Sequence, residues 1–120
     1  MTNVPDVPHF DEDDLMERLM GNRELAKRVA RTFMDSMPLQ LAALAGAIQS
    51  SDAQATRHAA HSIKGAAANV SGKAVQDVAA QLEKLGEAGK LEAASGLLRQ
   101  LSDSLQTLEP KIRNFVSGIK

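Results

Sequence analysis

Apolar residues recur at the spacing of α-helices along most of the chain. The clearest repeat lies near the C-terminus, where two interleaved rows of apolar residues each recur every seven positions. The first row is Leu91, Leu98, Leu105, Ile112 and Ile119, and the second is Ala94, Leu101, Leu108 and Phe115. A heptad pattern of this length predicts a long helix with one apolar face. Pro110 belongs to neither row, so we expect it to bend the helix without disturbing that face.

Two helices are predicted in the first half of the chain. Residues 11–20 form a short helix with acidic residues in its first turn, which complement the helix dipole, and it ends near Gly21. Asn22 is a suitable N-cap for a second helix. Because the apolar spacing continues past Pro38, we expect the proline to kink this helix rather than end it. Its apolar positions are Leu25, Val29, Phe33, Met37, Leu41, Leu44 and Ile48.

Two more helices are predicted between these segments. Ser50, Ser51 and Asp52 form a polar break that caps a helix over residues 52–70. A further helix follows over residues 73–88 and is ended by Gly86 and Gly89. Its inward positions are Val75, Val78, Ala79, Leu82 and Leu85.

The predicted fold is therefore all-α, an antiparallel four-helix bundle with a short additional N-terminal helix. Residues 1–9 hold two prolines and no periodic pattern, which predicts an extended lead-in. Residues 10–120 are expected to form a single domain, because no segment is long enough to act as a linker.

Composition narrows the classes of function. The 120 residues are 43% hydrophobic, with three Phe and no Trp or Tyr, so the core must be aliphatic. A net charge of −1 gives no reason to expect nucleic-acid binding. The absence of cysteine excludes disulfides and thiolate chemistry. No apolar segment is long enough to insert into a membrane, and we expect a cytoplasmic domain.

The helix over residues 52–70 carries the candidate chemistry. At about 100° per residue, its apolar positions fall within roughly 60° of Ile63. His61 lies on the opposite side, next to Gly65 and Ala68, whose small side chains leave the ring accessible. Lys64, three residues after His61, can place an ammonium beside a group bound to the ring. The apolar side consists of Thr56, Ala59, Ala60, Ile63, Ala66, Ala67 and Val70.

The segment AHSIKGAAANVSG resembles the signature of histidine-containing phosphotransfer (HPt) domains, approximately A-H-x-x-K-G-x-x-x-N-x-G. His61, Lys64, Gly65 and Asn69 match it position for position. The family usually has glycine two residues after the asparagine, whereas this chain has Ser71. That departure concerns the end of the helix and leaves the histidine site intact.

The resemblance implies that His61 accepts a phosphoryl group from an aspartyl phosphate and passes it to another aspartate, with Lys64 and Gly65 as part of the site. The implied partners are response-regulator receiver domains and an upstream hybrid sensor histidine kinase. Mg²⁺ would come from the receiver, and this chain would bind no cofactor of its own. Since no nucleotide-binding segment is present, we expect a phosphocarrier without autokinase activity.

Residues near His61 are expected to orient its ring, to support the helix end or to contact the partner. The helix over residues 73–88 should pass near His61, where either Gln81 or Glu83 could accept a hydrogen bond from the second ring nitrogen. Asn69 is expected to be structural, with hydrogen bonds near the helix end. The expected partner surface consists of Arg57, His58, Ser62 and Ala68.

Other interpretations of the histidine segment are weaker. His58 and His61 have near metal-ligand spacing, but no cysteine and no suitably placed carboxylate completes a zinc site. The run from Gly65 to Lys73 differs from a phosphate-binding loop in its glycine spacing and in Ala74, where Ser or Thr is needed. Two alternatives in function stay open. One is an adaptor or inhibitor that binds a receiver or kinase without chemistry, and the other is the phosphoacceptor domain of a chemotaxis-type kinase.

Overall fold

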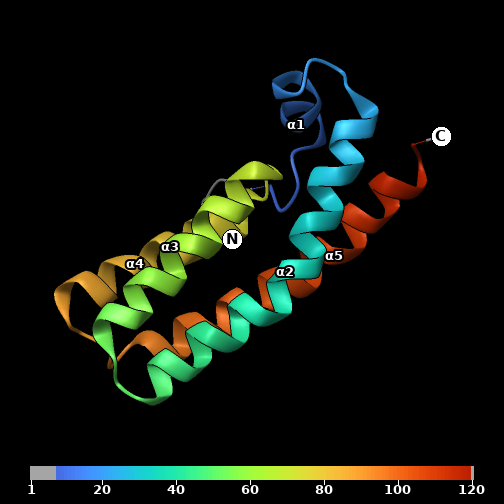
Figure 1. The fold of residues 1–120 in the computed structure, drawn as a ribbon. Coiled ribbons are helices and arrows are strands. Elements are labelled where there is room, and N and C mark those ends of the chain that lie inside the picture. The colour runs from blue at the N-terminus through green and yellow to red at the C-terminus, as the bar shows by residue number, and fades with distance from the viewer. Residues whose placement is uncertain (1–7, 120) are drawn as a thin grey trace, which may run out of the picture.

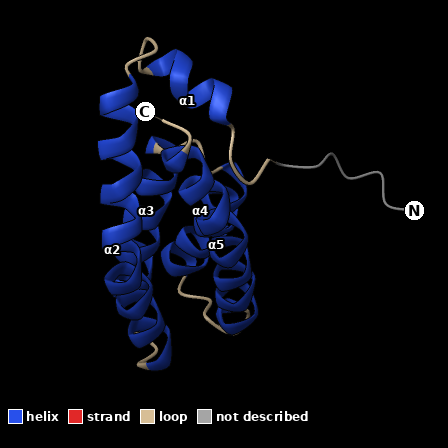
Figure 2. Ribbon diagram, turned by 90° about the vertical axis from the view of Figure 1, so that its right-hand side faces the viewer, coloured by secondary structure: helices blue, strands red, loops and turns tan. Residues whose placement is uncertain are grey.

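The structure, a computed structural model, describes residues 8–119 and contains five helices. The predicted all-α class and the bundle with a short N-terminal helix are confirmed. Helices α3 and α4 lie side by side, as do α2 and α5, while α1 lies across one end of the bundle (Figures 1 and 2). The helices are α1 (Glu12–Arg18), α2 (Arg23–Gln49), α3 (Ala53–Asn69), α4 (Lys73–Ala88) and α5 (Ala94–Ser117).

Side-chain caps determine where three helices begin. Side-chain oxygens of Asp11, Asn22 and Asp52 each accept a 3.0 Å hydrogen bond from a backbone N–H three residues later. Each cap satisfies a donor that the first turn of a helix leaves unpaired. The predicted starts at Asn22 and Asp52 are therefore confirmed. The first helix ends at Arg18, earlier than predicted, because Met20 adopts a left-handed conformation with φ of 56°.

Two prolines lie inside helices without ending them. Helix α2 continues through Pro38, and α5 continues through Pro110. The axis of α2 changes direction about midway along its length (Figure 1), in agreement with the kink expected near Pro38. A proline has no N–H to donate, and its ring displaces the carbonyl four residues earlier.

The prediction that Gly86 helps to end α4 is wrong. Gly86 lies within the helix and is buried, whereas Gly89 is the C-cap, with a left-handed φ of 68°. The heptad pattern also extends beyond the last helix at both ends. Leu91 and Ile119 lie outside α5, yet both are half-buried and pack against the core.

The core is aliphatic, as the composition predicted. Each fully buried leucine or isoleucine contributes about 1.5–3 kcal/mol through removal of its side chain from water. A smaller cluster beneath α1 includes Phe115, whose ring meets that of Phe10 edge to face at a centroid distance of 5.3 Å. The largest fully buried apolar side chains are Leu15, Leu44, Ile63, Leu82, Leu101, Leu108, Ile112, Val70 and Val75.

Helix α1 is tied to the C-terminal end of α3 by a polar cluster. Nη2 of Arg18 donates to the backbone oxygens of Ala68 and Asn69, at 3.0 and 3.2 Å, and to Oγ of Ser71 at 2.7 Å. The Ser71 hydroxyl in turn donates to Oδ2 of Asp14 at 2.6 Å. The Ser71 hydrogen bond is the main cause that lowers the pKa of Asp14, against the opposing effect of desolvation. Arg18 thus adds a donor to carbonyls in the last turn of α3, where the regular hydrogen bonds of the helix end.

Ser71 occupies the position where the HPt pattern has glycine. It is buried and has a φ of 56°, the left-handed conformation that glycine adopts without steric cost. Its hydrogen bonds with Asp14 and Arg18 hold it there. The departure from the pattern is therefore compensated by α1, and α3 still ends at Asn69.

The backbone of Pro8 is hydrogen-bonded to the first turn of α4. Residues 1–7 of the predicted lead-in lie outside the described residues, while the carbonyl of Pro8 accepts a 3.1 Å hydrogen bond from the backbone N–H of Ala74. Between residues 8 and 119, no helix combines the length and the apolar character needed to cross a membrane.

Replacement of Arg18 by alanine is expected to loosen the junction between α1 and α3. The free energy of unfolding should fall by about 1 kcal/mol, which is less than is usual for hydrogen bonds to charged groups because Arg18 is partly exposed. Amide hydrogen exchange at residues 70–72 should accelerate. The control is Glu17→Ala, which removes an exposed side chain from the same helix. Unchanged exchange in Arg18→Ala would show that α1 does not stabilise this junction.

Candidate functional site

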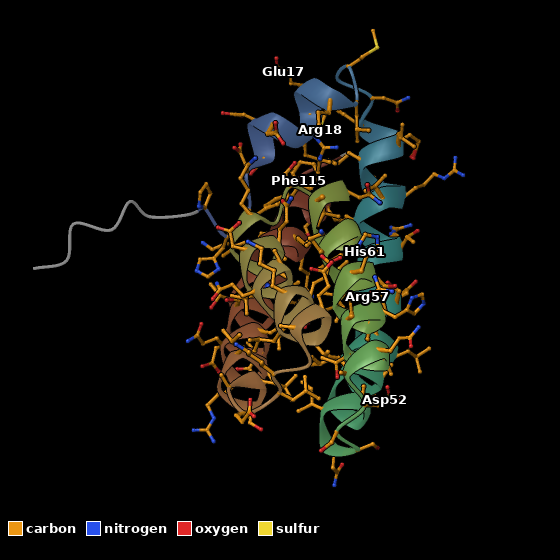
Figure 3. All side chains as sticks on the ribbon, turned by 90° about the vertical axis from the view of Figure 1, so that its left-hand side faces the viewer. Glu17, Arg18, Asp52, Arg57, His61 and Phe115 are labelled. Atoms are coloured by element: carbon orange, nitrogen blue, oxygen red, sulfur yellow. The ribbon has the colours of Figure 1, made fainter. Side chains whose placement is uncertain are left out.

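His61 lies on the outward face of α3 with 63% of its side chain exposed. The opposite face of the helix is fully buried at Ala60, Ile63 and Ala67. The predicted division of α3 into an apolar and an accessible face therefore holds. Figure 3 shows Asp52 at the start of α3, then Arg57 and His61 along the helix, with Arg18 on α1 beyond them.

Glu83 on α4 contacts two of the predicted site residues on α3. Its Oε2 lies 2.8 Å from Nδ1 of His61, and its Oε1 lies 2.5 Å from Nζ of Lys64. The Glu83 side chain is only 13% exposed, so it holds these contacts at the edge of the core.

The carboxylate determines which ring nitrogen is free. An ionised carboxylate only accepts hydrogen bonds, so Nδ1 of His61 must carry the proton that is donated to Glu83. The neutral ring then has its lone pair on Nε2. Because the side chain is mostly exposed, this nucleophilic nitrogen is available to a partner.

Lys64 and His61 stabilise the ionised form of Glu83. The hydrogen bond from Lys64 is the largest cause that lowers the pKa of Glu83, with a smaller contribution from His61, and together they outweigh desolvation. Glu83 is therefore ionised at neutral pH. Lys64 lies beside the imidazole, as predicted, but it is paired with this carboxylate.

The structure brings together only some of the residues predicted for the site. Of the two candidates on α4, Glu83 contacts His61, whereas Gln81 is exposed and makes no hydrogen bond to the ring among the described residues. Asn69 is also exposed, and its backbone carbonyl accepts from Arg18. A Cβ atom at Gly65 would meet nothing within 4 Å, so packing inside the bundle does not require this glycine.

The expected partner surface is partly open. His58 and Ser62 are exposed, whereas Arg57 and Ala68 are half-buried. Within the described part of the chain, no third His, Cys, Asp or Glu joins His61 and Glu83 in a group that could hold a metal ion.

Sequence reasoning missed a groove of about 500 Å³ and the arginine that contributes to its lining. The groove is lined by residues of α2 and of the C-terminal half of α3, together with Arg18 of α1. The only local signal for Arg18 was a cation in the last turn of a predicted helix, which does not reveal contacts with residues 50 positions away. The groove lining also includes Arg28, Thr32, Gln40, Ala66 and Asn69.

Comparison with known proteins identifies the family. Residues 28–110 match the family described as the Hpt domain. The chain therefore belongs to the Hpt domain family, and it is a histidine phosphotransfer module of the phosphorelay type. No curated protein matches the sequence.

Two solved structures are similar over almost their whole length. One is histidine-containing phosphotransfer protein B (HptB) from Pseudomonas aeruginosa PAO1, with 25% identity and a TM-score of 0.87 over 96% of this chain and 100% of that chain. The other is the HPT domain from the Hpt sensor hybrid histidine kinase from Shewanella, with 18% identity and a TM-score of 0.81 over 93% of this chain and 97% of that chain. At 18% identity, the second similarity concerns the fold alone.

Removal of the Lys64 ammonium is expected to raise the pKa of Glu83 toward its usual value of 4.5, because Lys64 is the main cause of its lowering. In the wild type, the stability contributed by ionised Glu83 is complete above the unfolded-state pKa and is lost as the pH falls through the lower folded-state pKa. Carboxyl ¹³C titration by NMR, with unfolding measured at several pH values, tests Lys64→Met against wild type. Lys84→Met, which removes an exposed cation from α4, is the control. A wild-type Glu83 that titrates at 4.5 contradicts this assignment.

Proposed function

We propose that His61 is the phosphoacceptor of this module and that it carries the phosphoryl group between receiver-domain aspartates. The observation that supports this most directly is an exposed imidazole whose Nδ1 is held 2.8 Å from the Glu83 carboxylate. The match of His61, Lys64 and Gly65 to the family signature agrees with it.

The transfer step needs no proton acceptor. The Nε2 lone pair attacks the phosphorus of the aspartyl phosphate, the bond from phosphorus to the carboxyl oxygen breaks, and the aspartate leaves as a carboxylate. The ring, still protonated on Nδ1, becomes a phosphorylated imidazolium. Glu83 stabilises the positive charge that develops on the ring. In the onward step an aspartate of the second receiver attacks phosphorus, the bond from Nε2 to phosphorus breaks, and the neutral ring is regained.

Lys64 supplies a positive charge for the phosphoryl group. Its ammonium is on a flexible four-carbon stem, so it can exchange its contact with Glu83 for one with a phosphoryl oxygen. Such a charge-assisted contact favours the transferring group, and catalysis of this reaction depends chiefly on position and charge.

The remaining components are proposed to come from the partners. The receiver domain would supply the reactive aspartate and Mg²⁺, and this chain would bind no cofactor. A hybrid sensor histidine kinase upstream and a response regulator downstream fit a cytoplasmic relay. Similarity to HptB, a histidine-containing phosphotransfer protein, supports the phosphotransfer role on which this setting depends.

Substitution of His61 tests the proposal. His61→Gln should abolish phosphoryl uptake from a phosphorylated receiver without loss of the fold, because the ring is exposed and contributes little to the core. The label on the wild type should be acid-labile, as expected for a phosphoramidate. His58→Gln alters a second exposed histidine of α3 on the expected partner surface, and it should still take up label because the phosphoacceptor remains. Uptake by His61→Gln would disprove the assignment, and receiver binding without transfer in the wild type would favour the adaptor alternative.

Enlargement of Gly65 tests access to the ring. Gly65→Gln should leave the fold intact and stabilise it by up to about 1 kcal/mol, since the side chain enters open space and glycine disfavours a helix. Transfer should slow by about tenfold or more, because a misplacement of the order of 1 Å suffices for such losses. Gly96→Gln, also in open space but on α5, should gain stability without slower transfer. Equal rates in all three proteins would exclude a role for Gly65 in access.

A further inference from the structure

We infer that Gly86 is a positioning residue, which sets the separation of α3 and α4 at which Glu83 reaches His61. The inference rests on the proposed function of His61. A Cβ atom at Gly86 would lie 2.6 Å from the backbone N of Arg57 and 2.8 Å from its Cα and from its Cβ. These are distances that side chains do not tolerate, and two of the three atoms are backbone, so they cannot move without α3 as a whole.

Gly86 is unusual among the glycines inside helices. A glycine in a helix interior costs about 1 kcal/mol relative to alanine, so its presence calls for a structural reason. At Gly46, Gly65 and Gly96 an added Cβ atom would meet nothing within 4 Å. Of these four helical glycines in the described chain, Gly86 alone lies against the backbone of another helix.

The contact with Arg57 lies next to the site. Arg57 precedes His61 by four residues on α3, and Gly86 follows Glu83 by three residues on α4. Because the two helices run antiparallel, the contact lies about one helical turn, roughly 5 Å, from the hydrogen bond between His61 and Glu83. Figure 3 shows Arg57 next to His61 along α3.

Small residues are also buried on both helices. Ala60 and Ala67 on α3 and Ala79 on α4 are fully buried. Helices α3 and α4 also form the most extensive contact of any helix pair in the described chain. The reach of the Glu83 side chain matches this separation, and its carboxylate meets the ring at 2.8 Å.

A methyl group at position 86 would alter this geometry. Carbon atoms in contact prefer about 3.5–4.0 Å, so the helices would have to separate by roughly 1 Å near Arg57. A hydrogen bond of 2.8 Å lengthened by a large part of that distance passes beyond the usual limit. The ring would then lose the acceptor that holds the proton on Nδ1.

The experiment measures the tautomer of His61 directly, without a phosphoryl donor. Long-range ¹H–¹⁵N correlation spectra are recorded at a pH where the ring is neutral. The wild type should show the proton on Nδ1, whereas Gly86→Ala should show a loss of this tautomer. Gly96→Ala, a substitution into open space, should leave the spectrum unchanged. An unchanged tautomer in folded Gly86→Ala would overturn the inference.

A double substitution separates positioning from general disturbance of the fold. If Gly86 acts through Glu83, then Gly86→Ala should have no further effect on the tautomer in a Glu83→Ala background. The rate of transfer should also fall by the same factor in Gly86→Ala and Glu83→Ala. A full additional effect in the double variant would show that Gly86 acts by another route.

Glu83→Asp keeps the test decisive if Gly86→Ala does not fold. Because Gly86 already touches α3, the helices cannot move closer to compensate for a carboxylate that is one methylene shorter. The Nδ1 tautomer should therefore be lost in Glu83→Asp, and its retention would overturn the inference. Failure of His61 to take up phosphate would refute the proposed function while leaving the tautomer results unaffected, so the two outcomes are distinguishable.

Discussion

The close packing of α3 against α4 is the constraint on which the site depends. A histidine that exchanges a phosphoryl group with a partner domain must be reachable, so burial cannot hold its ring. With 63% of its side chain exposed, His61 needs another source of order. Glu83 provides it from the neighbouring helix, and its carboxylate reaches the ring only because α3 and α4 approach closely at Gly86. The core thus orients a side chain that it does not enclose.

A carboxylate repels an incoming phosphoryl group, but the position of Glu83 limits this repulsion. Glu83 contacts the Nδ1 side of the ring, whereas the phosphoryl group would bind at Nε2 on the far side. Coulomb energy falls with distance, so attraction between Glu83 and the positive ring exceeds repulsion across it. Lys64 offsets part of the remaining negative charge, because it lies within 2.5 Å of the same carboxylate. The lowered pKa of Glu83 ensures that this charge is present at neutral pH.

The helices could be predicted from the sequence because their information is local. Caps such as Asn22 and Asp52 and the apolar spacing of α5 act within a few residues of each other. The choice of Glu83 over Gln81 could not be predicted, since it depends on the rotation of α4 against α3, 22 residues from His61. Gly86 was misassigned for a related reason. A glycine near a helix end is ordinarily a terminator, and only the position of Arg57 reveals a contact between helices.

Gly65 and Gly86 show how one residue type serves opposite needs on the two helices of the site. Each costs its helix about 1 kcal/mol relative to alanine. At Gly86 the missing side chain admits α3, and the result is order within the molecule. At Gly65 nothing within the described chain occupies the space, so no contact inside the bundle offsets the free-energy cost of this glycine. Since Gly65 is exposed one turn beyond His61, the partner that approaches the ring is the group able to use that space. The missing side chain at Gly86 therefore lets Glu83 hold the imidazole, and the missing side chain at Gly65 leaves the imidazole accessible to a partner.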